Sequence, residues 1–207
     1  MMKDKLAEIV DDLQPFLLEK GFTRRGRQFS FVRKYKTDYK RQEQISFQGR
    51  QHGNDPDTIY VSCFIGLYYP EVRKIYKSII TDHLSDYPIL AGSISHFSPS
   101  DNYLSVCYKQ NVNRESVVSE IKEELISGAF HLIEIFPDLN SIYEGILNEH
   151  PFLKNRLWGS LQYSDKLEVA SIIYALQGFD AVKGWLEKNL NDDLSVIDKF
   201  KELDNKI

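Results

Sequence analysis

The apolar residues of the first twenty positions recur at intervals of three and four, which is the spacing of one helix face. The recurring positions are Leu6, Ile9, Val10, Leu13 and Leu17. Pro15 lies inside this pattern and predicts a kink in the last turns, because proline removes a backbone hydrogen bond. Lys20 and Gly21 predict the end of the helix, with the glycine as a left-handed cap and Phe22 packing back onto the last turn.

Three segments that follow the helix have the composition and alternation of β-strands. The expected strands cover residues 27–35, 43–50 and 58–68. In the second strand, Ile45 and Phe47 alternate with polar residues, which indicates one buried and one wet face. The third strand has bulk on both faces, so we expect it at the centre of the sheet. The polar connections 36–42 and 51–57 are typical of hairpin loops and predict an antiparallel meander.

The rest of the chain has mainly helical periodicity. We expect helices over 70–84, 114–135, 139–147, 164–177, 181–190 and 194–203, and a strand over 102–109. Residues 89–97 fit either a short strand or irregular coil. The pattern therefore predicts an α+β fold, with an N-terminal helix, a mostly antiparallel sheet of about four or five strands, helices on one face and a C-terminal helical hairpin. The expected domains are an α+β domain, 1–150, and a helical subdomain packed on it, 151–207.

Composition indicates a packed protein of a reducing compartment. Of the 207 residues, 42% are hydrophobic and 13% aromatic, which is enough for a buried core. Cys63 and Cys107 lie in strand-like runs without a C-x-x-C partner, so a disulfide scaffold is excluded and reduced thiols are expected. No apolar signal core begins the chain, and no run approaches the length of a membrane span. We therefore expect a cytoplasmic protein that does not contact a membrane.

Charge is distributed unevenly along the chain. Residues 20–50 hold ten Lys and Arg against two acids, whereas residues 51–207 hold 14 bases against 23 acids. Internal compensation between the two parts would explain this asymmetry, but a basic segment can also mark a binding face. If it does, the residues expected to contact a partner are Arg24, Arg25, Arg27, Arg33 and Lys34.

Aromatic residues among these cations also fit nucleic-acid binding, in which bases stack on rings and guanidinium groups contact phosphates. Phe29, Phe31 and Tyr35 supply the rings. This signal is weak, because aromatic residues at a period of two usually face the core. An acidic protein partner would use the same surface.

Catalytic motifs are absent from the sequence. It has no P-loop, no dinucleotide-binding glycine pattern and no nucleophile-elbow serine. The histidines at positions 52, 83, 96, 131 and 150 lack the spacing of a zinc site. Cys63 lies in the most apolar strand, where burial should raise the thiol pKa and leave it inert. We expect no catalytic residue, metal or cofactor, although a small-ligand protein or a hydrolase with an unrecognised site stays as an alternative.

Two tryptophans near the C-terminus allow two interpretations. Trp158, Tyr163 and Trp185 would form an exposed aromatic patch or, as we expect, pack the helical hairpin onto the rest of the protein. Sequence alone does not define an oligomeric state.

A family resemblance adds to these inferences. The helix end Lys20-Gly21-Phe22, the turn Arg24-Arg25-Gly26-Arg27, Phe29 and the later Ile45-Ser46-Phe47-Gln48 resemble a bacterial family of small proteins catalogued as domain of unknown function 4304. The resemblance covers about the first 130 residues, and the family has no established activity to carry over. Some members resemble cytoplasmic immunity or accessory proteins encoded near toxins, which implies protein binding. We therefore expect non-enzymatic binding of a macromolecule, with a protein as the first candidate and nucleic acid as the second.

Overall fold

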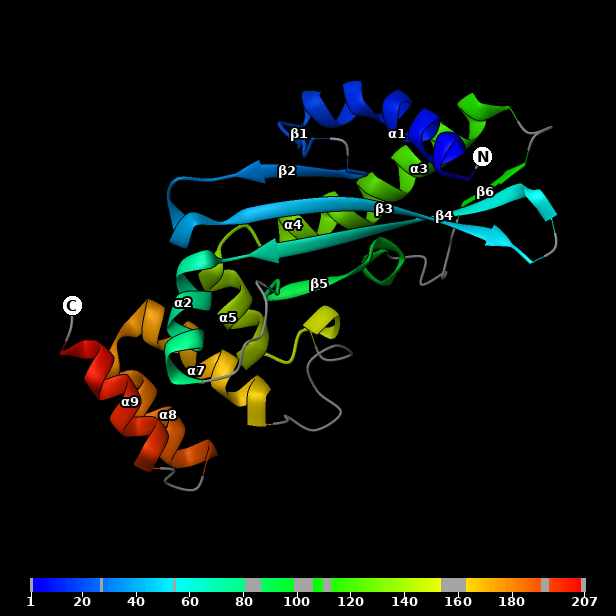
Figure 1. The fold of residues 1–207 in the computed structure, drawn as a ribbon. Coiled ribbons are helices and arrows are strands. Elements are labelled where there is room, and N and C mark those ends of the chain that lie inside the picture. The colour runs from blue at the N-terminus through cyan, green and yellow to red at the C-terminus, as the bar shows by residue number, and fades with distance from the viewer. Residues whose placement is uncertain are drawn as a thin grey trace. The chain divides into compact units, whose positions relative to one another are not determined.

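In the computed structural model, the chain forms two compact units that are interleaved along the sequence (Figure 1). Unit 1 consists of Met1–Lys34, Gln42–Leu67 and Leu90–Ile135, and unit 2 of Tyr35–Arg41, Tyr68–Ile89 and Phe136–Ile207. The structure describes residues 2–26, 28–53, 55–80, 87–98, 106–109, 113–153, 163–190 and 194–205. The expected boundary after residue 150 falls within unit 2, and the division into domains 1–150 and 151–207 stays a prediction.

The predicted α+β class is confirmed. Unit 1 begins with helix α1 (Met2–Glu19), and the described residues form a six-stranded antiparallel sheet. Its strands are β1 (Thr23–Arg24), β2 (Ser30–Lys34), β3 (Gln42–His52), β4 (Asp55–Tyr68), β5 (Leu90–Ser93) and β6 (Val106–Lys109). The order is β1-β2-β3-β4-β5, and β6 also pairs with β4. As predicted, β4 is central: residues 58–61 pair with β6, and residues 64–67 pair with β5.

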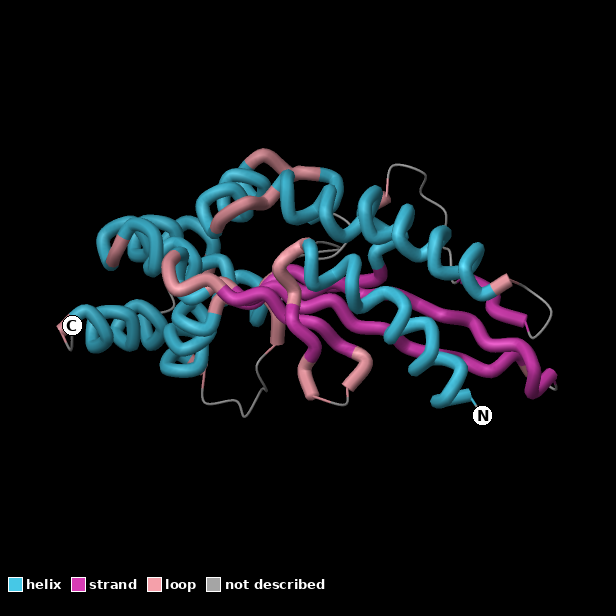
Figure 2. The backbone as a smooth tube through the Cα atoms, turned by 90° about the horizontal axis from the view of Figure 1, so that it is seen from above, coloured by secondary structure: helices cyan, strands magenta, loops and turns pink. Residues whose placement is uncertain are grey.

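Helices of unit 1 cover one face of this sheet. The apolar stripe of α1 is fully buried and packs on β3 and on α3 (Arg114–Glu124). Alternate residues of the two long strands, among them Ile45, Phe47, Val61 and Cys63, are buried beneath these helices. Figure 1 shows α3 behind the strands, and Figure 2 shows α1 and α3 side by side. We call the helix-bearing side of the sheet the covered face and the opposite side the open face.

The end of α1 has the predicted geometry. Gly21 has a φ of +82°, in the left-handed region that glycine adopts without strain. Its N–H donates to the Leu18 carbonyl at 2.9 Å, and the Phe22 N–H donates to the Leu17 carbonyl at 2.9 Å. This pair of bonds is the Schellman motif, and the buried Phe22 ring makes the expected apolar contact.

The helix predicted over 114–135 contains a π-helical segment. After α3, the chain continues as η3 (Leu125–Phe130), in the wider π form, and then as α4 (His131–Ile135). Gly128 lies so close to η2 (Ile94–Phe97) that an added Cβ would clash with the Ile94 carbonyl oxygen. Only glycine allows this approach between two backbones.

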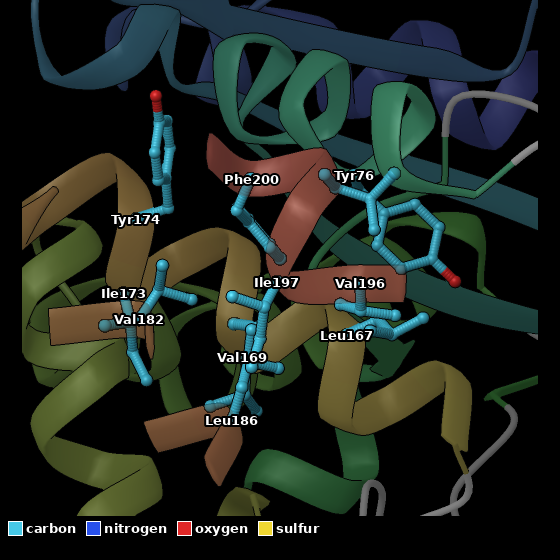
Figure 3. Packing of buried hydrophobic residues seen from close by; sticks show 12 residues of the cluster. Tyr76, Leu167, Val169, Ile173, Tyr174, Val182, Leu186, Val196, Ile197 and Phe200 are labelled. Carbon is cyan, nitrogen blue, oxygen red and sulfur yellow. The ribbon is translucent and has the colours of Figure 1, made fainter. Parts of the chain in front are cut away.

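Unit 2 is largely helical. It contains α2 (Pro70–Ile79), α5 (Leu139–Leu147), α7 (Tyr163–Gln177), α8 (Phe179–Asn189) and α9 (Leu194–Asp204). Their apolar faces meet in one cluster that includes Tyr76, Ile173, Leu186 and Phe200 (Figure 3). Trp185 is partly buried and packs against this cluster within unit 2, and the expectation that it joins the hairpin to the rest of the protein stays a prediction. Trp158, the side chain of Tyr163 and the predicted extensions over 80–84 and 102–105 lie wholly or largely outside the described residues.

A left-handed turn between β2 and β3 belongs to unit 2. In η1 (Asp38–Lys40), the φ angles are 52°, 55° and 57°, which is unusual for consecutive residues with side chains. Asp38 accepts a hydrogen bond from the Leu139 N–H at 3.3 Å, and the Tyr39 hydroxyl donates to the Ala175 carbonyl at 2.8 Å. Lys40 pairs with Glu71 at 3.0 Å, so each side chain of the turn is held by a helix of unit 2.

Candidate functional site

The side chains of the basic segment, residues 20–50, are distributed over both faces of the sheet. Arg24 pairs with Phe31 across the β1–β2 ladder, and Arg33 pairs with Glu43 across the β2–β3 ladder. Since Phe31 and Glu43 are fully buried under the helices, both arginines lie on the covered face. Lys34 pairs with Gln42 and has the opposite orientation, because side chains alternate along a strand.

Arg25 follows Arg24 and so belongs to the open face. Its N–H donates to the Ser30 carbonyl at 2.9 Å, which continues the ladder beyond β1. Arg27 lies outside the described residues. Of the five predicted binding residues, the structure therefore places Arg25 and Lys34 on the open face and Arg24 and Arg33 on the covered face.

Arg33 contacts both β3 and the C-terminal end of α1. Its Nε lies 2.6 Å from Oε2 of Glu43, whose side chain is 0% exposed. Its Nη1 donates to the Lys20 carbonyl at 2.8 Å, and the guanidinium carbon lies 4.7 Å from the centre of the Phe22 ring. One side chain thus neutralises a buried carboxylate, satisfies a free carbonyl at the end of α1 and stacks on the ring that ends the helix.

Arg24 is also engaged inside unit 1. Its Nη1 forms an ion pair with Asp11 and a 3.3 Å hydrogen bond with Gln14, both on α1. Its side chain is about one-fifth exposed, so the contact lies at the rim of the covered face.

The open face carries cations that have no counter-charge among the residues that the structure describes. Arg25 and Lys34 are exposed, as are Arg50 at the end of β3 and Lys109 on β6. None of them has an ion pair with any described residue. Alternation along β3 from Gln42 reaches Arg50, and Lys109 pairs with Thr58 of β4. Among the described strand positions of this face there is no Asp or Glu.

The middle of the open face is neutral. Its half-buried residues on β3 and β4 are Gln44, Ser46, Tyr60, Ser62 and Phe64. They offer amide and hydroxyl groups that donate and accept hydrogen bonds, together with two aromatic rings. A neutral middle bordered by cations can hold an anionic surface, but it lacks the paired acid and base that proton-transfer catalysis needs.

Among the described residues of the covered face, Glu124 and Cys63 have raised pKa values. Burial raises the pKa of the Glu124 carboxyl to about 7, with a smaller contribution from the charge of Glu120. Burial raises the pKa of the Cys63 thiol well above its usual value, and the nearby Glu124 adds to the effect. The sequence-based expectation for this thiol is confirmed. A thiol that stays protonated at neutral pH is a poor nucleophile.

The described histidines do not belong to a metal-binding group. His150 makes edge-to-face contacts with the rings of Phe136 and Phe152, with ring centres 5.2 and 5.3 Å away. Within the described ranges, no three His, Cys, Asp or Glu side chains are grouped as metal ligands. No helix in the same ranges is long and apolar enough to cross a membrane.

Comparison of the chain with protein-family models, curated proteins and solved structures gave no match. The resemblance to the family of unknown function 4304 accordingly stays a prediction from the residues.

Proposed function

We propose that this protein acts by binding another protein through the open face of its sheet, and that it is not an enzyme. The observation that carries the proposal is the open face itself, with exposed Arg25, Lys34, Arg50 and Lys109 and no carboxylate among its described strand positions. A partner with an acidic surface would be attracted over a distance and oriented on contact. Arg24 and Arg33 each form an ion pair within unit 1, and these contacts support a structural role for both arginines.

The layout of the face favours a protein partner. Along β3, the distance from Gln42 beside Lys34 to Arg50 is about 26 Å, at roughly 3.3 Å per residue. This length matches a standard interface of about 800 Å² per partner. A charged rim around a neutral, partly aromatic middle is the usual arrangement of such interfaces. The family resemblance supports the same class, with an accessory or immunity role in the cytoplasm, and the free thiols fit a reducing compartment.

Charge reversal tests this proposal. In the variant Arg25→Glu/Lys34→Glu, we expect recovery of the partner from the source cells to fall at least about tenfold, as measured by affinity capture with quantitative mass spectrometry. The matched control is Lys188→Glu/Lys201→Glu, which reverses two exposed lysines of unit 2 and should leave recovery unchanged. Equal recovery with both double variants would contradict the proposal.

Single-stranded nucleic acid is the second candidate, favoured by Tyr60 and Phe64 on the same face. This candidate predicts that the fluorescence anisotropy of a random oligonucleotide rises on binding and that affinity falls steeply with salt. The chain has a net charge of −4, which weakens long-range attraction of a polyanion. We therefore expect that the oligonucleotide does not bind at low salt. Tight binding of the oligonucleotide that depends on Arg25 and Lys34 would favour nucleic acid over a protein as the partner.

A further inference from the structure

Three cations of the open face have an even spacing along the sheet. Lys34 pairs with Gln42 of β3. Arg25, two strands away from β3, lies level with Ser46, because its N–H bonds to the residue that pairs with Ser46. Arg50 follows Ser46 four residues later on β3 itself. At roughly 3.3 Å per residue, the three positive charges recur at intervals of about 13 Å along the strand direction.

An uncharged row lies on the neighbouring strand. Tyr60, Ser62 and Phe64 are alternate residues of β4, and each is half-buried on the open face. Since β3 and β4 are adjacent, this row is about 4.8 Å to one side of β3. The two rings offer apolar area that a partner would cover. An occupant of the open face therefore needs acidic groups along one side and apolar groups along the next.

The geometry of a sheet face favours a helix as this occupant. Backbone hydrogen-bonding groups of a sheet lie in its plane, so the open face presents side chains alone. An extended segment laid on it would lose water from its own backbone groups without gaining partners for them, whereas a helix satisfies these groups internally. A second sheet would need a largely apolar surface, but Gln44, Ser46 and Ser62 are polar.

The dimensions of a helix also fit. With its side chains a helix is about 10–12 Å wide, which corresponds to roughly two strand spacings and would cover β3 and β4 together. The distance of about 26 Å from the level of Lys34 to Arg50 corresponds to about 17 helical residues. The covered face already carries such an element, since α1 has 18 residues and packs on β3. Figure 1 shows α3 and α4 behind the strands, away from the open face.

We propose that the partner docks an amphipathic α-helix of about 17 residues along β3 and β4 of the open face. A stripe of Asp or Glu on this helix faces Lys34, Arg25 and Arg50, and an apolar stripe beside it covers Tyr60 and Phe64. Acidic residues two turns apart are separated by about 11 Å, and the long cationic side chains reach over the small remaining difference. The inference rests on the function proposed above and specifies the element by which the partner is recognised.

Designed peptides test the helix directly. The probe is a helical peptide of about 18 residues with glutamates two turns apart along one side and leucines along the adjacent side. One control peptide has the same composition in an order that destroys both stripes. A second control keeps the stripes but carries two interior prolines, which prevent the helix. By fluorescence anisotropy at low salt, we expect the striped helix to bind at least about tenfold more tightly than either control.

Variants and NMR locate the bound peptide. Arg50→Glu should weaken binding of the striped peptide about tenfold, whereas Lys188→Glu/Lys201→Glu, the control in unit 2, should leave it unchanged. In the parent protein, the amide shifts caused by the peptide should be concentrated in β2, β3 and β4. This mapping does not depend on the folding of any variant.

The results separate the docked helix from the broader proposal of a protein partner. Failure of the striped peptide to bind, equal binding of the three peptides, or amide shifts concentrated in α1 and α3 would each overturn the helix. If Arg25→Glu/Lys34→Glu still reduced partner capture in that case, the open face would remain the binding site and the partner would use another element. If that variant left capture unchanged, both proposals would be wrong.

Discussion

The covered and open faces of the sheet use the same basic segment in opposite ways. On the covered face, Arg24 and Arg33 each meet a carboxylate of unit 1. On the open face, Arg25 and Lys34 meet none among the described residues, although each is the immediate neighbour of one of those arginines. Strand alternation alone separates the two pairs. A cluster of cations in a sequence can therefore combine residues that form ion pairs inside the protein with residues that are exposed. Only the exposed residues are available to a partner.

The largest expected effect comes from Arg33 on the covered face. Arg33→Met removes the cation 2.6 Å from the fully buried Glu43 carboxylate, and we expect the free energy of unfolding to fall by about 3 kcal/mol. Urea denaturation measures this change. Arg33→Met/Glu43→Met removes both charges and should recover part of the loss. A fall of less than about 1 kcal/mol in the single variant would remove the structural role that we assign to Arg33.

The second effect depends on pH, through Glu124 on the same face. Its pKa rises from 4.5 to about 7 on folding, so its stabilising contribution is complete below pH 4.5 and is lost as the pH rises through 7. Glu124→Gln should therefore match the parent near pH 4.5 and exceed it by about 2 kcal/mol at pH 8, with allowance for partial exposure. Urea denaturation at both pH values measures the difference, and an equal difference at both would contradict the linkage.

A smaller effect is expected at the rim of the covered face. Arg24→Ala removes an ion pair whose Asp11 side chain is 59% exposed, so we expect a loss of about 0.5–1 kcal/mol. Thermal unfolding at low and high salt distinguishes this pair from the Arg33 pair. Salt should reduce the Arg24 effect and leave most of the Arg33 effect, because buried charges are screened less.

The smallest effect on stability belongs to the open face. Arg25→Ala/Lys34→Ala should change the free energy of unfolding by less than about 0.5 kcal/mol, because neither side chain has an ion pair among the described residues. The same double variant should weaken partner binding. If it unfolded the protein as readily as Arg33→Met, the contrast between the two faces would disappear.

Local sequence patterns predicted several elements of the fold. The spacing of apolar residues, Gly21 and the alternation in β3 predicted α1, its cap and the buried strand face, because each depends on neighbours in sequence. The local patterns did not predict which carboxylates pair with the arginines, because Arg24 and Asp11 come together only when the sheet packs on α1. Strand β1 was hidden in the expected turn because its two residues are too few for a pattern.

The candidate site was predictable in part. Arg25 and Lys34 were among the expected residues, while Arg50 and Lys109 required the strand pairing. Glu124 did carry a signal: it stands three residues after Ile121 and so continues the apolar stripe of α3. The neighbouring Glu120 and Glu123 are exposed, so glutamate at this position does not by itself distinguish a buried carboxyl from a surface one.

The left-handed turn of η1 has a consequence for how the chain can be cut. Its backbone is costly by itself, and the helices that hold Asp38, Tyr39 and Lys40 come much later in the sequence. A fragment that stops before α5 keeps the expensive turn and loses two of its three anchors. Truncation before α5 would thus lower the stability of the protein more than the number of residues removed suggests. A minimal version of this protein must preserve both interleaved units.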